Sequence, residues 1–361
     1  MRGPEDVTKP TDADREAQIK QIRALSAEEF LAVEILDKAP IVDGLVHKRD
    51  LVAFAARRRH GKTSLVTNLA VEGAVGAPDF LGYPIPHAFR SLLVLVEDDP
   101  RELQDRLRGL IGERDAGGRL HIITRDDFHA HEVPINAADK LFRLLIWTLA
   151  QAHRPDLIVL DNLAHLINAE YNDPVRVHEL MKFGYQLARA FNCAIIFVAH
   201  PRKQGQGDDR VTLTGDPEAF FESIMGTSHF INSTGSLWGL ERDLARGYSR
   251  FLAGRQRSDG HQQLFYIRLG DDGRFEVLDE AATHLPLVVN TDQRKRAWAL
   301  LPEPPTSFGY REGQDLVRPA LRSSDSYAKW IKECRRLHVV VDTEDGKLRK
   351  ADGLPRLGGA N

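Results

Sequence analysis

The sequence has 361 residues, with 49 Lys and Arg against 52 Asp and Glu, so its formal net charge is -3. Its 42% of hydrophobic residues is enough to bury a core, which excludes a disordered protein, and its length excludes a single small module. No run approaches the about 18 apolar residues of a membrane span, and the N-terminus has no apolar signal region, so we expect a soluble, cytoplasmic protein without a membrane partner. Cys193 and Cys334 lack the paired spacing of zinc sites, so we expect neither a disulfide nor a structural metal.

Three segments differ in composition along the chain. Residues 1–38 are charged, and Asp12 to Leu36 predicts one or two helices without a strong apolar face, so we expect an N-terminal helical extension. In residues 39–288 short apolar runs alternate with helix-like segments, which is typical of βαβ units and a mostly parallel sheet. A change after Thr291 predicts a small C-terminal domain over residues 289–361.

Four apolar runs of the main domain have the length of buried strands. They are Leu51–Ala55, Leu92–Val96, Leu157–Leu160 and Ala194–Ala199. Helices are predicted after Asp99-Pro100 and after Asp173-Pro174, where an acidic N-cap and a proline precede apolar residues spaced by three and four. The polar, glycine-rich stretch from Lys203 to Glu218 predicts a loop.

A phosphate-binding P-loop is predicted directly after the first strand, in the segment Ala56-Arg57-Arg58-Arg59-His60-Gly61-Lys62-Thr63. Such a loop needs a tight turn whose N–H groups face the phosphates, a lysine for the β- and γ-phosphates and a hydroxyl for Mg²⁺. We therefore predict a site for ATP and Mg²⁺. Its predicted nucleotide-binding residues are Arg59, His60, Gly61, Lys62, Thr63 and Ser64. Ala56 replaces the first glycine of the strict pattern, and the three arginines could instead be solvated.

Polar residues also follow the next two strands, at the end of the sheet where open α/β folds bind ligands. Asp161 is typical of the acidic residue that supports the Mg²⁺ shell, although a strand-end cap is its alternative role. Glu97 could polarise the water that attacks the γ-phosphate, with Asp98 or Asp99 as competing candidates. Because Asp99 precedes Pro100, a helix cap explains it better.

Three further residues are candidates for sensing or contacting phosphate. His200 follows the fourth strand and could touch the γ-phosphate, although a lone histidine is usually structural. Arg255 and Arg257 are two apart on a predicted strand, so their side chains share a face. They could reach a neighbouring subunit's phosphate, or they could be two solvated arginines.

The order of these motifs resembles the RecA-like P-loop ATPase core over residues 38–278. The segments that carry the resemblance are GLVHKRDLVAFAARRRHGKTSL, LLVLVEDDPRELQDRL, DLIVLDNLAHL, IIFVAHPRK and GSLWGLERD. They are most similar to RepA-type plasmid hexameric helicases and, more distantly, to DnaB-type replicative helicases. The resemblance implies an α/β fold, ATP with Mg²⁺ and a ring, typically a hexamer, with active sites between subunits.

Residue by residue, the resemblance implies nucleotide binding by Gly61, Lys62 and Thr63 and a catalytic Glu97. It implies metal coordination by Thr63 and Asp161, a γ-phosphate sensor at His200 and a trans-acting finger pair at Arg255 and Arg257. Ala56 and the long loop after Lys203 depart from the family's pattern, and these departures concern reaction rate and DNA contacts rather than ATP binding.

The C-terminal segment is basic, because residues 291–350 hold 13 Lys and Arg against 9 Asp and Glu. From Ser326 to Leu337, helical spacing puts Lys329, Lys332 and Arg336 on one face and Tyr327, Ile331 and Cys334 on the other. A hairpin is predicted next, with Asp345-Gly346 as its turn and a basic return strand. Helix and hairpin resemble a winged-helix domain that contacts DNA or protein, although Pro319 interrupts the preceding helix.

Two classes of function remain open from the sequence. The first is an ATP-hydrolysing, ring-forming motor that acts on single-stranded DNA as a replicative helicase. The alternative is an ATP-switched DNA-binding regulator or loader, or a recombinase-like filament, without unwinding activity. Glu97 together with a finger pair favours the motor.

Overall fold

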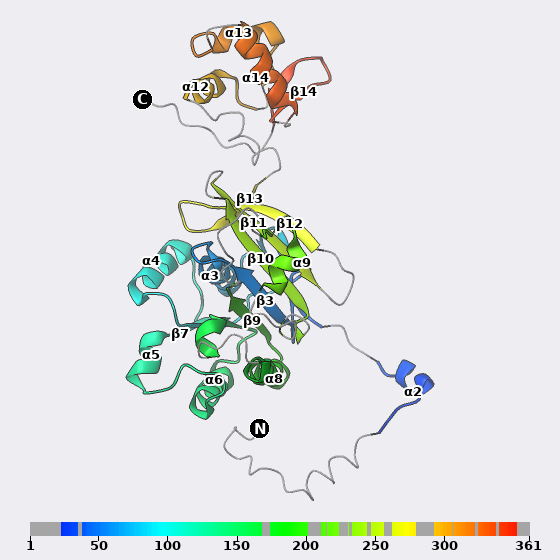
Figure 1. The fold of residues 1–361 in the computed structure, drawn as a ribbon, viewed down its shortest axis with the longest axis vertical. Helices are drawn as coiled ribbons and strands as arrows, with labels where there is room; N and C mark the ends of the chain where they lie inside the picture. Colours follow the sequence, from blue (N-terminus) through cyan, green and yellow to red (C-terminus); the bar gives the residue numbers. More distant parts are fainter. Residues whose placement is uncertain are drawn as a thin grey trace, which may run out of the picture. The chain divides into compact units, whose positions relative to one another are not determined.

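The computed structural model describes residues 23–34, 38–167, 174–200, 211–213, 215–223, 230, 233–243, 247–255, 262–278, 292–304, 306–321, 324–336 and 339–351 (Figure 1). The chain divides into two compact units. The first comprises Met1–Glu241, Phe251–Leu264 and Gly270–Phe275, and the second comprises Arg242–Arg250, Phe265–Leu269 and Glu276–Asn361. The predicted boundary between residues 288 and 289 stays a prediction.

A nine-stranded sheet is the centre of the fold, in the order β13-β12-β11-β10-β3-β9-β8-β6-β7. Its strands are β3 (Leu51–Ala56), β6 (Ser91–Leu95), β7 (Leu120–Thr124), β8 (Leu157–Asp161), β9 (Ala194–Ala199), β10 (Ser236–Asp243), β11 (Tyr248–Arg255), β12 (Gln262–Leu269) and β13 (Phe275–Leu278). Every pairing from β10 to β7 is parallel. The carboxyl ends of these six strands therefore lie along one edge.

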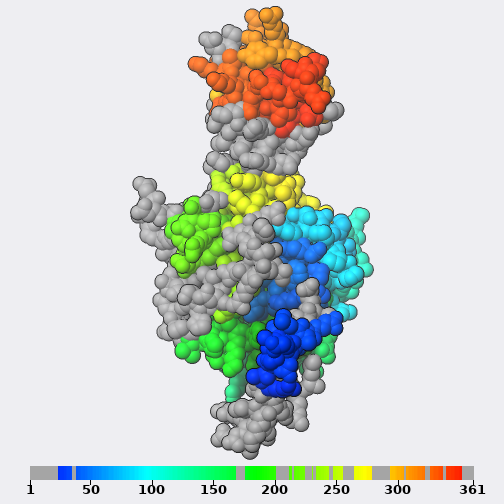
Figure 2. Space-filling view, turned by 90° about the vertical axis from the view of Figure 1, so that its right-hand side faces the viewer, coloured from blue at the N-terminus to red at the C-terminus, as the bar shows by residue number. Residues whose placement is uncertain are grey.

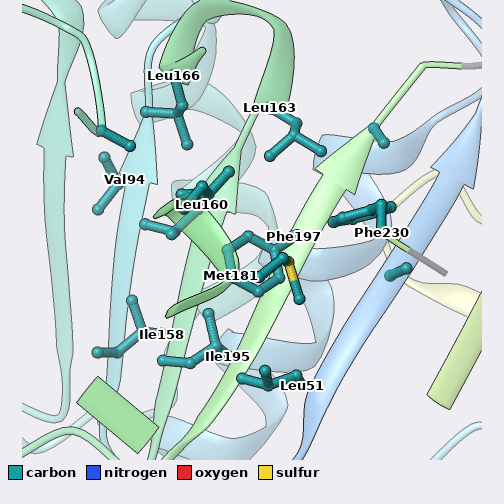
Figure 3. Packing of buried hydrophobic residues seen from close by; sticks show 14 of the residues in the cluster. Leu51, Val94, Ile158, Leu160, Leu163, Leu166, Met181, Ile195, Phe197 and Phe230 are labelled. Atoms are coloured by element: carbon teal, nitrogen blue, oxygen red, sulfur yellow. The ribbon is translucent and has the colours of Figure 1, made fainter. Parts of the chain in front are cut away.

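Helices cover the sheet, and the residues of β3 alternate between its two faces. Leu51, Ala53 and Ala55 belong to a core cluster with residues of α6 and α8. Figure 3 shows Leu51 in this cluster together with Phe197 of β9 and Met181 of α8. The P-loop helix α3 also contacts β3. The described helices of this unit are α2 (Ala27–Leu31), α3 (Lys62–Val75), α4 (Pro100–Ile111), α5 (Arg125–Ala130), α6 (Lys140–His153), α7 (Leu163–Leu166), α8 (Pro174–Phe191) and α9 (Pro217–Glu222).

The four predicted strands are confirmed to within one residue at each end, as β3, β6, β8 and β9. So is the α/β class with a mostly parallel sheet. The helix predicted after Asp99 is α4, and Asp99 caps it by accepting from the N–H groups of Arg101 and Glu102. Two short antiparallel pairs lie outside the main sheet. They are β1 (Pro40–Val42) with β2 (Val46–His47) and β4 (Asp79–Phe80) with β5 (Tyr83–Pro84).

One loop prediction was wrong at its end. Pro217 and Glu218, expected in the loop that began at Lys203, form the first turn of α9. The helix starts there because Asp216 accepts the N–H of Ala219 at 2.9 Å and because Phe220 and the following phenylalanine are buried. Residues 203–210 and Thr214 of that stretch, and the predicted cap Asp173, lie outside the described residues.

Of the predicted N-terminal helices, the structure describes α2, and residues 1–22 lie outside the described part. Ser26 and Glu29 form a capping box at its start. None of its residues is buried, so α2 is fully at the surface, where it is drawn in deep blue in Figure 2.

The C-terminal part of the second unit contains α12 (Asp292–Leu300), α13 (Tyr310–Val317), α14 (Ser324–Arg336) and an antiparallel hairpin of β14 (Val340–Asp342) and β15 (Leu348–Lys350). The predicted faces of α14 are confirmed where they are described. Tyr327, Ile331 and Cys334 are buried, and Lys329 and Lys332 are exposed. The side chain of Arg336 lies outside the described residues.

Two expectations for this part need correction. Pro319 does not interrupt a helix, because α13 ends at Val317, two residues before it. The return strand β15 is also less available to DNA than its sequence indicated. Lys350 is 1% exposed, its ammonium lies 4.8 Å from the centre of the Trp298 ring, and it donates to Glu303 at 2.7 Å.

In the described part of the chain, no helix has the length and apolar character needed to cross a membrane.

Candidate active site

The P-loop follows β3 as a tight turn that leads into α3. The N–H of His60 donates to the carbonyl of Arg57 at 3.2 Å, and both Arg59 and Gly61 have a positive φ, of 63° and 92°. Gly61 is the N-cap of α3, and a left-handed backbone there favours glycine over any other residue. The free N–H groups of the first helical turn therefore lie beside the loop, as an anion site requires.

Thr63 in the first turn of α3 and Asp161 at the end of β8 come together, although they are 98 positions apart in the sequence. The hydroxyl of Thr63 donates to Oδ2 of Asp161 at 2.6 Å. Asp161 is buried, and its other oxygen, Oδ1, has no hydrogen-bond partner among the residues that the structure describes. Burial raises the pKa of Asp161 to about 6, which the Thr63 hydrogen bond and the Lys62 charge oppose.

This arrangement suits Mg²⁺. A buried carboxylate oxygen without a partner costs free energy, and a cation held nearby would remove that cost. Carboxylate and hydroxyl oxygens are the ligands that Mg²⁺ prefers, and it usually takes one or two from the protein and others from water and phosphates. Among the described residues, no cluster of three His, Cys, Asp or Glu side chains able to hold a metal occurs. Thr63 and Asp161 are the residues that would hold it.

Lys62 is the first residue of α3, and its side chain is buried beside these acidic groups. Burial lowers the pKa of the Lys62 ammonium, whereas the carboxylates of Asp161 and Glu97 raise it. A buried cation at a helix N-terminus provides a strong positive potential for phosphate oxygens.

Glu97 follows β6, and its carboxylate lies between two imidazoles. Oε1 is 3.2 Å from Nε2 of His165, and Oε2 is 3.5 Å from Nε2 of His200. Hydrogen bonding to His200 lowers the pKa of Glu97 to about 2, although partial burial opposes the shift, and Asn162 and Lys62 lower it further. Glu97 is therefore ionised at neutral pH.

The two competing carboxylates are occupied elsewhere. Oδ2 of Asp98 accepts a hydrogen bond from Arg106 of α4 at 2.5 Å. Asp99 caps α4, as described above. Both side chains therefore have partners in α4, and Glu97 is the acidic residue of this segment that contacts His165 and His200.

His200 connects the P-loop strand to Glu97. Its Nδ1 lies 3.2 Å from the carbonyl oxygen of Ala56, and its Nε2 faces Oε2 of Glu97 at 3.5 Å. The buried Ala56 is the last residue of β3, so the alanine that departs from the strict P-loop pattern lies within the sheet.

The structure gives less information on the other predicted residues. Ser64 and His60 are partly buried at the start of α3, and Arg59 is exposed. Arg255 is the last residue of β11, but its side chain and the whole of Arg257 lie outside the described residues, so the finger pair stays a prediction.

A family model described as an AAA domain matches residues 14–206, more than half of the chain. The chain belongs to this AAA-domain family. No curated protein matches this AAA domain. Among solved structures, a KaiC-like protein from Pyrococcus horikoshii OT3 is 11% identical with a TM-score of 0.43, over 66% of this chain and 94% of that chain. The RadB recombinase is 15% identical with a TM-score of 0.43, over 64% and 92%.

The P-loop, the mostly parallel sheet and the family assignment together make this AAA domain an ATPase domain of the RecA-like P-loop type. Two polar groups of its site, His165 and Arg125, are not predicted by the sequence pattern. His165 lies in α7, four residues after Asp161, and Arg125 follows β7, a strand that was not among the four predicted. Their common signal is a polar residue within four positions of the end of a parallel strand, on the edge where the other site residues gather.

Proposed function

We propose that this protein is a Mg²⁺-dependent ATPase that couples hydrolysis to movement along single-stranded DNA, as a ring-forming helicase of the RepA type. The observation that carries the hydrolytic part is the hydrogen bond between Thr63 and Asp161, close to Glu97 and its two imidazole neighbours. Within the described part of the chain, the second oxygen of Asp161 is buried without a partner. These groups lie at the carboxyl ends of β3, β8, β9 and β6, where α/β sheets bind ligands.

Each residue has a role that follows from its chemistry. The N–H groups after Gly61 and the ammonium of Lys62 would bind the phosphates, and the hydroxyl of Thr63 and the carboxylate of Asp161 would hold Mg²⁺. The bound ion would supply charge neutralisation on the β- and γ-phosphate oxygens. Nε2 of His200 lies near enough to Glu97 to report a change at the P-loop strand.

Glu97 acts on the attacking water mainly by orienting it. A carboxylate whose pKa is near 2 is a weak base, so it accepts a hydrogen bond from water rather than removing a proton before the transition state. As the water becomes more acidic during attack on phosphorus, the same carboxylate can accept its proton.

The DNA-binding part of the proposal depends on the C-terminal helices and hairpin. Three helices followed by a hairpin, with Phe308 pairing to Leu348 as a further short bridge, are consistent with a winged-helix domain. Lys329 and Lys332 are exposed on α14 and available to phosphates. Assembly into a hexameric ring, with Arg255 and Arg257 reaching a neighbouring subunit's nucleotide, is the quaternary part of the proposal.

Steady-state ATP hydrolysis with and without single-stranded DNA tests the proposal. Lys62→Ala and Glu97→Gln should each abolish the turnover that DNA stimulates. Asp98→Asn is the matched control, because this neighbouring carboxylate is bound by Arg106 and should lose little activity. If Asp98→Asn is inactive and Glu97→Gln is not, the assignment of Glu97 is wrong.

Mass photometry with ATP and DNA tests the quaternary part. Closed rings of a fixed subunit number are expected for the motor. Long assemblies of increasing mass would instead favour a recombinase-like filament. A single burst of one ATP per subunit, without DNA-stimulated turnover, would favour an ATP-switched regulator or loader.

A further inference from the structure

His165 is held in place by a short helix anchored in the core. The helix α7 begins after Asn162, whose side-chain oxygen accepts the N–H of His165 at 3.3 Å. Leu163 and Leu166 on either side of the histidine are fully buried, and Figure 3 shows both among the core residues. The backbone that carries the imidazole is therefore fixed, while the imidazole itself, 40% exposed, lies at the open edge of the site.

The Nε2 atom of His165 has two polar neighbours. Oε1 of Glu97 is 3.2 Å away, and Nη2 of Arg125, at the start of α5, is 3.5 Å away. A guanidinium only donates hydrogen bonds, and an ionised carboxylate only accepts them. Nε2 can therefore donate to Glu97 when it carries a proton or accept from Arg125 when it does not, but it cannot do both in one protonation state.

The shorter distance decides between these two contacts. Glu97 is ionised, so a proton on Nε2 makes a charge-assisted hydrogen bond to it, whereas the 3.5 Å separation from Arg125 is at the limit of a hydrogen bond. The favoured state has Nε2–H directed at Oε1 of Glu97.

We propose that His165 is a positioning residue for Glu97, fixing one oxygen of its carboxylate so that the other, Oε2, is presented to the attacking water. Oε2 has the longer imidazole contact, 3.5 Å to Nε2 of His200 against 3.2 Å between Oε1 and Nε2 of His165. An unheld carboxylate at the end of a strand would sample several rotamers, and alignment of the reacting groups contributes strongly to rate. Arg125 competes for the same nitrogen, because its guanidinium can donate to Nε2 only when Nε2 carries no proton.

The proposal rests on the proposed ATP hydrolysis, and it predicts an effect on kcat alone. His165→Phe keeps a ring and removes both nitrogens, so we expect kcat to fall by about tenfold, with KM for ATP and the melting temperature unchanged. His165→Gln keeps an amide donor near Nε2 and should recover most of the rate. His129→Phe, at an exposed histidine of α5, is the matched control and should resemble the wild type.

The decisive measurement repeats His165→Phe in the Glu97→Gln background, with residual hydrolysis of radiolabelled ATP followed over hours. If His165 acts through Glu97, the second substitution should add no further loss. A wild-type kcat in His165→Phe, or an equal loss in both backgrounds, would overturn the proposal, and a fall in melting temperature with a raised KM would assign His165 a structural role instead.

Imidazole ¹H–¹⁵N spectra separate failure of this inference from failure of the proposed function. In the full-length protein labelled at histidine, Glu97→Gln should shift the Nε2 resonance of His165. If the wild type hydrolyses no ATP but this shift is seen, the contact stands and the proposed function fails. If the wild type is active and the resonance does not respond, the positioning role is wrong.

Discussion

Replacing Gly73 with alanine should destabilise the first unit, although alanine is the better helix former. Gly73 lies in α3, the helix that begins at the P-loop. A Cβ added there would lie 2.0 Å from Cζ of Phe89 and 2.2 Å from Cε1. Phe89 is 4% exposed, and its N–H donates to the carbonyl of Gly73 at 3.0 Å. The ring therefore cannot move away without disturbing a backbone hydrogen bond.

Two opposing terms set the size of the effect. Alanine in place of glycine inside a helix gains about 1 kcal/mol. Overpacking a core typically costs about 1–3 kcal/mol, and carbon atoms normally approach to about 3.5–4 Å, so a separation of 2.0 Å belongs at the upper end. The net loss is about 2 kcal/mol, which for a unit of this size lowers the melting temperature by about 4–8 °C.

Thermal unfolding followed by circular dichroism measures this change. Gly109→Ala is the matched control, because it makes the same substitution within α4, where the nearest atom to the new Cβ is the carbonyl oxygen of Asp272 at an ordinary 3.4 Å. It should leave the melting temperature equal or raise it. Phe89→Leu should recover part of the loss when it is combined with Gly73→Ala. An unchanged or raised melting temperature for Gly73→Ala would refute the reasoning.

Three other predictions concern the site and the C-terminal helices. Asp161→Asn should abolish ATP turnover at every Mg²⁺ concentration, which a magnesium titration of the ATPase rate would show. The pKa of Glu97 is lowered from 4.5 to about 2, so its contacts stabilise the folded chain above pH 4.5 and are lost as pH falls toward 2. The difference in unfolding free energy between wild type and Glu97→Gln should therefore be constant from pH 7 to 5 and shrink below pH 5. A constant difference down to pH 3 would contradict this prediction. Lys350→Met should leave DNA affinity unchanged because Lys350 is buried, whereas Lys332→Ala should reduce the slope of log affinity against log salt by about one.

The sequence predicted those features of the site that depend on position along a strand. Thr63 and Asp161 each follow a run of buried apolar residues, and parallel pairing brings the ends of such runs to one edge of the sheet. Their hydrogen bond at 2.6 Å is thus a consequence of strand order. Asp99 was likewise assigned correctly as a cap, because a following proline is a local signal.

Features that depend on packing could not be predicted in this way. Lys350 follows a basic pattern typical of an exposed strand, but Trp298 and Glu303 bury it, and neither contact is visible in its own segment. His165 could equally have been exposed at the end of a short helix. It reaches Glu97 because the buried leucines of α7 turn it toward β6, which is a result of the tertiary fold.

Because of the strand order, His200 would transmit to Glu97 a structural change caused by nucleotide binding. The strand β9 pairs with β3 and β8, so His200 at its end lies between the P-loop strand and the acidic residues. Its Nδ1 is bound to the carbonyl of Ala56, the residue just before the loop, and its Nε2 faces Glu97. A small shift of Ala56 when phosphates bind would rotate the imidazole and change the 3.5 Å separation from Oε2 of Glu97. His165 holds the opposite oxygen from a helix anchored in the core, so such a shift would act on Oε2 while Oε1 stays fixed.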